Sequence, residues 1–278
     1  MLKSSMLIPH EKLKDCIKVF WFLEGNGNGN LINCQKIIPD GCATVFIVLD
    51  GEINFSLYKN GEMKRGIYVH PPVMKSYFAY VSDDAYFIDI QLNPSVFYKL
   101  FNIAVDELID TMYTLEDLSI NFDSSFLERV YKCKHDKSKV YSELNNFLID
   151  LFHKSDFNKN ETLCNINKLY KDGDLDSFFK SQNLSIRQIE RNLKRTTGLT
   201  PKFLSRIGRF YSILDYIKFR EHNTKFKDLA KEQKFSNQSH FIREFKSLTE
   251  STPESFLNIN IEFPQYQGLC NLRQFSKY

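Results

Sequence analysis

Short apolar runs separated by turn residues dominate the first 120 positions of the chain. The runs are rich in Val, Ile, Phe and Tyr, which favour strands, and Gly, Asn, Asp and Pro fall between them. The turn dipeptides Asp50-Gly51 and Asn60-Gly61 each lie beside such a run. Many short strands with few helical signals predict a small barrel or sandwich. The expected strands are residues 17–24, 43–49, 53–58, 76–81 and 85–92.

Apolar residues adopt a helical spacing after residue 93. Pro94 is well placed to open a first helix. The segment 122–152 is again helical in pattern, except for a charged stretch at 132–139 that we expect to form a loop. Residues 155–173 are expected to be a connector. The positions predicted to be buried in these helices are Val96, Phe97, Leu100, Phe126, Val130, Leu144, Phe147, Leu148 and Leu151.

Residues 174–256 are helical in pattern throughout, and they contain an internal repeat. The stretch LKRTTGLTP at 193–201 aligns with FKSLTESTP at 245–253, an offset of 52 residues. A repeat of this kind indicates a duplicated structural unit. Each copy has a short apolar stripe, a turn, and a second helix whose outer face is polar and basic. This order is typical of a helix-turn-helix.

The second helix of the first copy has clear start and stop signals. Ser185 can cap it, with Gln188 three residues on as in a capping box, and Gly198 is a common residue at a helix end. The apolar positions of this copy are Leu175, Phe178 and Phe179 in the first helix and Ile186, Ile189 and Leu193 in the second.

The second copy follows the same plan. Phe235 lies in its turn, and Ser236 is expected to cap its second helix. The apolar positions of this copy are Phe226, Leu229 and Ala230 in the first helix and Phe241, Phe245 and Leu248 in the second.

A helix from Pro201 to about Glu221 is predicted between the two copies. Thr200 supplies a capping hydroxyl, and proline suits the first helical position. At ~1.5 Å per residue the helix spans roughly 30 Å, close to the ~34 Å between successive major grooves on one side of B-DNA. A stiff rod of this length can place the two outer helices in adjacent grooves. Its apolar face is Leu204, Ile207, Tyr211, Leu214 and Ile217.

Charge is unevenly distributed along the chain, whose formal net charge is +3. Residues 1–150 hold 15 Lys and Arg against 20 Asp and Glu, a net charge of −5. Residues 174–256 hold 16 Lys and Arg against 10 Asp and Glu, a net charge of +6. A basic segment joined to an acidic one favours contact with a polyanion, although a surplus of six also suits a solvated surface.

The segment 174–256 resembles the DNA-binding domain of the AraC/XylS family of bacterial transcription regulators. The resemblance is carried by residues 184–191, 194–202 and 235–246, and by Thr252-Pro253. It implies that the helix after each turn enters a major groove, where Arg and Gln can pair with guanine and adenine edges. The implied base-contacting residues are Arg187, Gln188, Arg191, Gln238, Ser239, His240 and Arg243. The candidates for phosphate contacts are Lys194, Arg195, Lys202, Arg206, Arg209 and Lys246.

Two residues depart from the family pattern. Lys234 stands where the family usually has Gly before the Phe of the second turn, and Glu250 stands at another position that is usually Gly. A residue with a Cβ atom is costly in a tight turn if φ is positive. The departures leave open whether the second unit is less well formed or grips DNA more weakly.

The first 120 residues resemble, more loosely, the N-terminal region of some members of this family. The similarity lies in Phe20-Trp21 and in IPDG at 38–41. Such regions usually form a cupin-like barrel that senses a small molecule or mediates dimerisation. The implied fold is α+β, a cupin-like β-barrel domain followed by an all-α domain with two helix-turn-helix units joined by a linker helix. The expected division is a sensor or dimerisation domain at 1–120, a helical connector at 121–173, a DNA-binding domain at 174–256 and a tail at 257–278.

Several conspicuous residues of the first part have ordinary structural interpretations. Trp21 is the single tryptophan, and its apolar strand favours a core position over a ligand platform. Asp40 is expected to support a turn, and His70, which could line a pocket, is expected to be structural. The glycine-rich stretch 25–30 lacks the following lysine and helix start of a phosphate loop, so we expect a strand connection there.

Neither an enzymatic site, a cofactor nor a metal is predicted. Residues 1–120 contain only His10 and His70, too few for a metal-binding cupin, and Cys34 with Cys42 is the one close pair of thiols. The six cysteines form no CxxC pair and are expected to be free. The chain has no apolar run near the roughly 18 residues of a membrane span and no visible signal peptide, so a cytoplasmic protein without membrane contact is expected.

The sequence thus predicts a transcription regulator that binds double-stranded DNA sequence-specifically and is controlled by a ligand or by dimerisation through its N-terminal domain. A small-molecule effector and a homodimer are both open, as are the target promoter and the direction of regulation. The alternative is a small-molecule-binding or enzymatic barrel with a degenerate DNA-binding unit, an interpretation motivated by Lys234 and Glu250.

Overall fold

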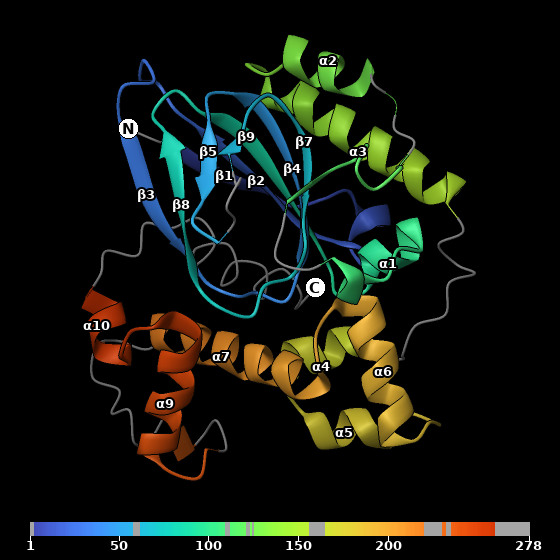
Figure 1. Ribbon diagram of the computed structural model, residues 1–278, viewed down its shortest axis with the longest axis vertical. Helices are drawn as coiled ribbons and strands as arrows, with labels where there is room; N and C mark the ends of the chain where they lie inside the picture. The colour runs from blue at the N-terminus through green and yellow to red at the C-terminus, as the bar shows by residue number, and fades with distance from the viewer. Residues whose placement is uncertain are drawn as a thin grey trace.

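A computed structural model of the protein describes residues 3–57, 62–108, 112–120, 123, 125–155, 165–219, 230–231 and 235–258. Figure 1 shows an N-terminal β-sheet part, helices packed beside it, and a helical C-terminal part. This mixed architecture agrees with the predicted α+β class.

Two antiparallel sheets form the β-sheet part of the described chain. The larger sheet contains, in spatial order, β1 (Lys3–Leu7), β2 (Ile17–Glu24), β9 (Tyr86–Leu92), β4 (Ala43–Asp50), β7 (Gly66–His70) and β10 (Tyr113–Thr114). The smaller sheet contains β3 (Ile32–Ile37), β8 (Tyr77–Ser82), β5 (Ile53–Phe55) and β6 (Glu62–Met63). All five expected strands are present: β2 has the expected bounds, and the other four have shifted ends. Tyr58 lies outside the described residues.

Five strands were not expected from the sequence, and β3 shows why. Its polar residues have weak strand propensity, yet all of β3 pairs with β8, from Ile32 opposite Ser82 to Ile37 opposite Tyr77. Pairing with a neighbour, which local propensity does not report, decides its conformation.

Strand β9 shows how the larger sheet separates two environments. Ile88 and Ile90 point to one side, whereas Asp89 and Gln91 point to the other, as the two-residue period of a strand requires. The apolar side is covered by three helices, α1 (Val96–Phe101), α2 (Ser125–Lys132) and α3 (Lys137–Lys154). The described chain also contains two short 3-10 helices, η1 (Glu11–Leu13) and η2 (Val105–Glu107). The other side faces the smaller sheet.

The ends of these helices refine the sequence predictions. Helix α1 begins at Val96 rather than at Pro94, because Ser95 adopts a left-handed φ of 72° before it. The expected loop at 132–139 narrows to the residues between Lys132 and Lys137.

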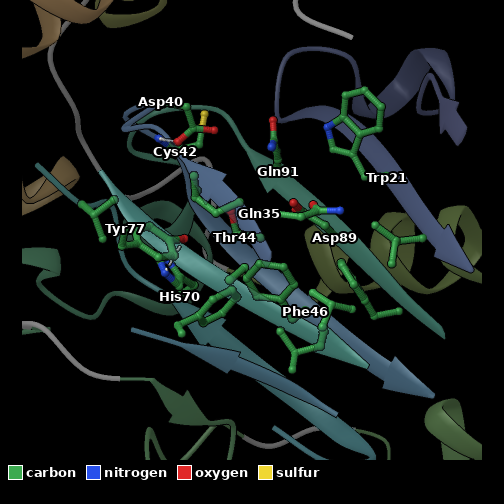
Figure 2. A pocket seen from close by; sticks show the side chains of 18 of the residues that line it. Trp21, Gln35, Asp40, Cys42, Thr44, Phe46, His70, Tyr77, Asp89 and Gln91 are labelled. Atoms are coloured by element: carbon green, nitrogen blue, oxygen red, sulfur yellow. Dashed lines mark hydrogen bonds between the residues drawn. The ribbon is translucent and has the colours of Figure 1, made fainter. Parts of the chain in front are cut away.

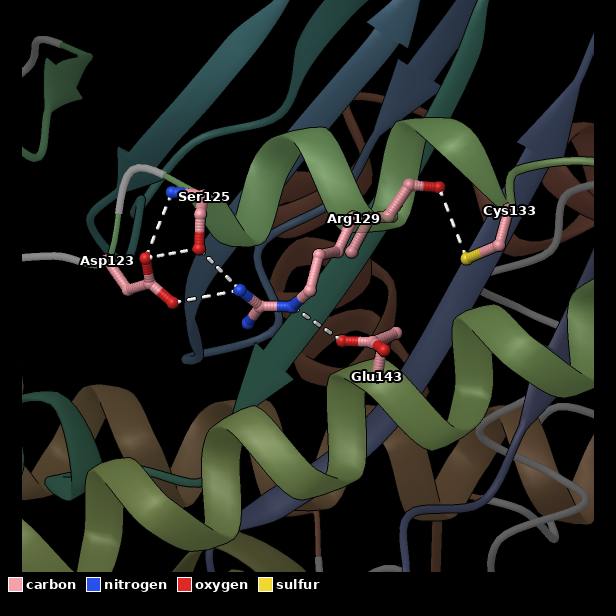
Figure 3. A network of polar contacts seen from close by, with 6 residues as sticks. Asp123, Ser125, Arg129, Cys133 and Glu143 are labelled. Atoms are coloured by element: carbon pink, nitrogen blue, oxygen red, sulfur yellow. Dashed lines mark hydrogen bonds and ion pairs between the residues drawn. The ribbon is translucent and has the colours of Figure 1, made fainter.

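A polar network joins α2 to α3 (Figure 3). Arg129 donates to Glu143 on α3 at 3.0 Å and to Asp123 at 3.0 Å, and Asp123 also accepts the backbone N–H of Ser125 at 2.9 Å. The groups are exposed, so each pair contributes at most ~1 kcal/mol. Their role is to set the position of α2 beside α3.

The helical part packs around α7 (Pro201–Phe219), with α6 and α9 at opposite ends of it in Figure 1. The other helices described here are α4 (Ile166–Asp172), α5 (Leu175–Lys180), α6 (Ile186–Thr197), α9 (Gln238–Thr249) and α10 (Pro253–Asn258). Helix α4, inside the expected connector, contributes Ile166 and Leu169 to this core. It approaches α7 closely at Gly208, where a Cβ atom would lie 2.7 Å from the carbonyl oxygen of Tyr170.

Most predicted apolar positions of the helical part are buried. Leu193, Leu204, Ile207, Phe241 and Phe245 have almost no exposed area. One prediction is wrong: Ile186 is 60 % exposed, because it is the first residue of α6 and points away from the core. Phe226, Leu229 and Glu221 lie outside the described residues, as does the side chain of Ile217.

The two parts of the molecule touch each other. The hydroxyl of Tyr211 on α7 donates to the carbonyl of Pro39 at 3.3 Å, and Ile38 is buried in the helical core. Lys18 on β2 donates to the hydroxyl of Tyr170 on α4 at 2.6 Å. These contacts join the turn before β4 to α7, and β2 to α4.

Candidate functional site

The expected capping box is present at the start of α6. The side chain of Ser185 accepts the backbone N–H of Gln188 at 3.4 Å, and the side-chain oxygen of Gln188 accepts the backbone N–H of Ser185 at 2.9 Å. Gly198 ends the helix with a left-handed φ of 72°. Gln188 is therefore engaged in its own helix cap, although its side chain remains exposed.

The outer face of α6 is cationic and accessible. Arg187, Arg191 and Lys194 are exposed, while Ile189 and Leu193 bury the opposite face. Arg195 is also exposed, but its guanidinium lies 5.4 Å from the ring of Tyr98 on α1. Arg195 therefore contacts α1 rather than extending freely into solvent.

Helix α9 begins one residue later than expected. Asn237, rather than Ser236, is the N-cap, because its side chain accepts the backbone N–H of His240 at 2.8 Å. Ser236 instead pairs with the ring of His240 at 3.1 Å, and that ring packs edge-on against Phe235. His240 is thus half-buried and held by the turn.

The remaining predicted contact residues of α7 and α9 divide into two groups. Gln238, Ser239, Arg243, Lys246 and Lys202 are exposed. Arg206 and Arg209 are partly buried and have partners inside the protein.

Arg206 and Arg209 hold α7 against the second repeat. Arg206 forms an ion pair with Glu244 of α9 at 2.6 Å and also reaches Ser247. Arg209 stacks 5.8 Å from the ring of Phe235, and burial lowers the pKa of its guanidinium. Both side chains therefore have an evident structural role beside any contact with phosphate.

Glu250 has the positive φ that is usually adopted by Gly, the residue that the family usually has at this position. It ends α9 with a left-handed φ of 56°. Its carboxylate, which is exposed, lies 3.3 Å from the ammonium group of the partly buried Lys36 on β3. Lys234, the other departure from the family pattern, lies outside the described residues.

A cavity lies between the two sheets (Figure 2). The volume of the cavity, including its open mouth, is about 850 Å³. Aromatic rings line one region, where Phe55 and Tyr77 pack edge-on at 5.4 Å and His70 stacks on Tyr77 at 5.5 Å. The polar residues on the wall include Gln35, Asp40, Thr44, Asp89 and Gln91.

Three adjacent strands of the larger sheet supply one row of this wall. Asp89 on β9 lies directly opposite Trp21 on β2 and Phe46 on β4. Gln91, two residues on, lies opposite Thr44. Burial, together with the charge of the nearby Asp40 carboxyl, raises the pKa of Asp89 to about 8.

His70 lines the cavity and also has the structural role that the sequence favoured. Its Nε2 atom lies 3.0 Å from the hydroxyl of Tyr77. Burial lowers the pKa of His70 to about 4, so the ring is neutral at physiological pH.

A chain of polar groups leads from the cavity to the helical part. Asp40 accepts the backbone N–H of Cys42 at 3.0 Å, which supports the predicted turn. Lys18 lies 3.8 Å from the sulfur of Cys42 and is bonded to Tyr170. Burial raises the pKa of Asp40, and the charge of Lys18 opposes that shift.

Cys34 and Cys42, the close pair of cysteines in the sequence, are poorly suited to nucleophilic chemistry. Cys34 is exposed on β3, whereas Cys42 is buried, and burial raises the pKa of Cys42 to about 12. A thiol with so high a pKa is a poor nucleophile. No cluster of possible metal ligands occurs in the described part of the chain. Cys164 and Cys270 lie outside it.

Sequence reasoning did not single out Asp89 and Gln91 as site residues. The signal for them was the alternation of apolar and polar residues along 86–92, which usually marks a strand with one solvated face. The smaller sheet covers that face here. Trp21, expected in the core, is indeed only 7 % exposed but also borders the cavity.

One family model matches the N-terminal part of the chain. A family model described as a domain of unknown function (DUF6597) matches residues 5–114. No curated protein matches the chain. No helix in the described ranges is long and apolar enough to cross a membrane.

Some solved structures are similar to the chain at low identity. ToxT from Vibrio cholerae is 15 % identical, with 82 % of this chain and 97 % of ToxT covered and a TM-score of 0.42. ToxT from Vibrio cholerae O395 bound to (E)-4-(8-methylnaphthalen-1-yl)but-3-enoic acid is 17 % identical, with coverages of 82 % and 97 % and a TM-score of 0.39. The AraC-like transcriptional activator CuxR is 10 % identical, with coverages of 100 % and 86 % and a TM-score of 0.22. Identities and TM-scores this low carry no functional information about the chain.

Proposed function

We propose that this protein is a transcription regulator of the AraC/XylS type that binds double-stranded DNA sequence-specifically through α6 and α9. The observation that carries the proposal is the pair of repeat-related helices, each with a defined cap, a buried apolar face and an exposed polar or cationic face. In this proposal α5 with α6 is the first helix-turn-helix unit, and α9 is the second helix of the other unit.

The exposed residues divide by chemistry into two roles. Arg187, Arg191 and Arg243 read base edges, because the guanidinium can make paired bonds to guanine. Lys194, Lys202 and Lys246 contact phosphates and make binding depend on salt. Gln238 and Ser239 stand at the exposed start of α9, where base contact requires no rearrangement of the helix.

The N-terminal part has the role of a receiver domain in this proposal. It corresponds to the cupin-like region of the resemblance, and its cavity is the place for a small-molecule effector. Alternatively, this domain pairs with the same domain of a second copy of the chain to form a homodimer. Contacts such as Lys18 with Tyr170 connect the domain to α4 and α7.

Fluorescence anisotropy with DNA from upstream of the protein's own gene tests the proposal. Arg191→Ala and Arg243→Ala should each weaken specific binding about tenfold or more, since a bidentate base contact is worth ~1–3 kcal/mol. Lys75→Ala, an exposed change in the β-sheet part, should leave binding unchanged. Equal affinity of wild type and both arginine variants, or no binding at low salt, would overturn the proposal.

The second candidate is a ligand-binding barrel whose DNA-binding unit has degenerated. The observation in its favour is that Gln188, Arg206 and His240 are engaged inside the protein and Glu250 is strained. This candidate predicts only nonspecific DNA affinity. Competition with unrelated duplex DNA in the same assay separates the two.

A further inference from the structure

The wall of the cavity has one sign of charge. Asp40 and Asp89 are the ionisable carboxyls that line it, and no Lys or Arg is among its described lining residues. A carboxylate or phosphate ligand would therefore find no opposite charge on this lining, and each carboxyl would repel it once that carboxyl is ionised. A positively charged ligand would find a partner.

Two polar atoms on this wall have no hydrogen-bond partner. They are Oδ1 of Asp89, an acceptor, and Nε1 of Trp21, a donor. The two residues lie directly opposite each other on β9 and β2, and the Trp21 ring is 7 % exposed. Figure 2 shows the indole nitrogen turned toward the interior that Asp89 and Gln91 also border. Buried polar atoms are normally paired, so this pair marks a place for a polar group of a ligand.

Aromatic rings complete the surroundings of Asp89. Phe46 lies beside it on β4, and Phe46 packs edge-on against Phe87 at 6.0 Å and close to Phe55 at 5.5 Å. Ring faces attract cations and also accept the apolar body of an organic molecule. A carboxylate set among aromatic rings suits an ammonium group on an apolar frame.

The positive charge of Lys18 can balance the negative charge of one of the two carboxyls, Asp40. It lies beside the Asp40–Cys42 turn. Its ammonium group donates to the hydroxyl of Tyr170 and lies over the rings of Tyr170 and Tyr211. With Asp40 and Asp89 ionised, this single lysine leaves one negative charge unmatched. One positive charge from a ligand would balance it.

We infer that the cavity between the two sheets binds a small organic monocation, an ammonium group on an apolar body, with Asp89 as its counter-ion and Trp21 and Phe46 beside it. The inference deepens the receiver role proposed above by naming the class of effector. Its test uses no DNA, so its failure is distinguishable from a failure of the regulator proposal.

The chain contains its own reporter, because Trp21 is its single tryptophan and lines the cavity. Titration of the full chain with 2-phenylethylamine, 2-phenylethanol and 3-phenylpropanoate compares a cation, a neutral molecule and an anion on similar phenyl frames. The cation should change the tryptophan fluorescence saturably and bind at least about tenfold more tightly than the alcohol, and the anion should bind most weakly. Methylamine and cyclohexylamine, which differ in apolar body, extend the series.

Asp89→Asn keeps the shape of the side chain and removes its charge. The variant should lose the tenfold preference for the amine while still binding the alcohol, which also demonstrates an intact cavity. Asp15→Asn, an exposed change in the same part of the chain, should behave as wild type. Thermal unfolding of both variants verifies that each is folded.

The pH dependence provides a second readout. Because the pKa of Asp89 is about 8, the amine must displace a proton from it at lower pH. Its affinity should rise about tenfold per pH unit up to pH 8 and then level off, whereas that of the alcohol should stay constant. The other titratable or charged groups around this site are Asp40, Cys42, Lys18, His70 and Tyr77.

Three results would overturn the inference. These are tightest binding by 3-phenylpropanoate, equal affinity for the amine and the alcohol, and an unchanged amine preference in Asp89→Asn. Absence of saturable binding for all three amines at millimolar concentration would overturn it as well.

Discussion

The residue type at a single position distinguishes the ends of the two repeat helices, whose backbone conformation there is the same. Gly198 ends α6 and Glu250 ends α9, and both have a left-handed φ, 72° and 56°. Glycine adopts this conformation without penalty, whereas a residue with a Cβ atom is destabilised by ~1–2 kcal/mol. The sequence alignment of the repeats located this difference, and the backbone shows that it has a physical cost.

Glu250→Gly should therefore stabilise the protein by about 0.5–1 kcal/mol, since relief of the left-handed strain outweighs loss of a partly exposed ion pair worth ~0–1 kcal/mol. Chemical denaturation followed by circular dichroism measures the change. Glu250→Ala is the matched control, because it removes the same carboxylate but keeps a Cβ atom. Equal stability of the glycine and alanine variants would contradict the explanation by backbone strain.

The packing of α7 against α9 gives Arg206 a different role from Lys202, although both residues belong to α7. The ion pair of Arg206 with Glu244 joins α7 to α9, and both side chains are about three-quarters buried, with exposures of 22 % and 26 %. Lys202 is exposed. The sequence placed both residues in one list of phosphate contacts, because a basic residue on a helix looks the same in either setting.

Arg206→Ala should lower the free energy of unfolding by ~1–3 kcal/mol, because Glu244 would lose a charged hydrogen bond. Lys202→Ala should change stability by less than ~0.5 kcal/mol but reduce the salt slope of DNA binding by about 1. Denaturation and salt titration of both variants measure the two effects. An Arg206→Ala variant with normal stability and a reduced salt slope would instead assign this arginine to phosphate.

At the scale of the whole molecule, the β-sheet part meets the helical part through a tight turn. Gly41 has φ of 74°, and a Cβ atom there would lie 3.2 Å from Ile207 and 3.3 Å from both Leu204 and Tyr170. The same turn contains Asp40, which lines the cavity. A change in the cavity therefore has a short physical route to α4 and α7.

Gly41→Ala should crowd this contact and increase amide hydrogen exchange in α4 and α7, together with a loss of ~1–2 kcal/mol from left-handed strain. Gly29→Ala is the matched control, since its φ of 82° imposes similar strain but its nearest neighbour is only the side chain of Asp84. Hydrogen exchange measured by mass spectrometry compares the two. If both variants exchange alike in α4 and α7, the turn does not couple the two parts.

Local pattern by itself determined much of this protein. Strong strand formers specified β2, β4 and β9, and the capping box with Gly198 specified both ends of α6, because these signals act within a few residues. The exposed cationic residues Arg187 and Arg191 followed from the helical period.

Tertiary structure decided what depends on distant neighbours. The sequence did not single out Asp89 and Gln91 within the expected strand 85–92, but pairing of β3 with β8 builds a second sheet opposite them and encloses a cavity. Arg206 became a link between helices because Glu244, 38 residues away, packs against it. A polar residue has the same local signal whether water, a ligand or another side chain faces it, so only the folded chain distinguishes these surroundings.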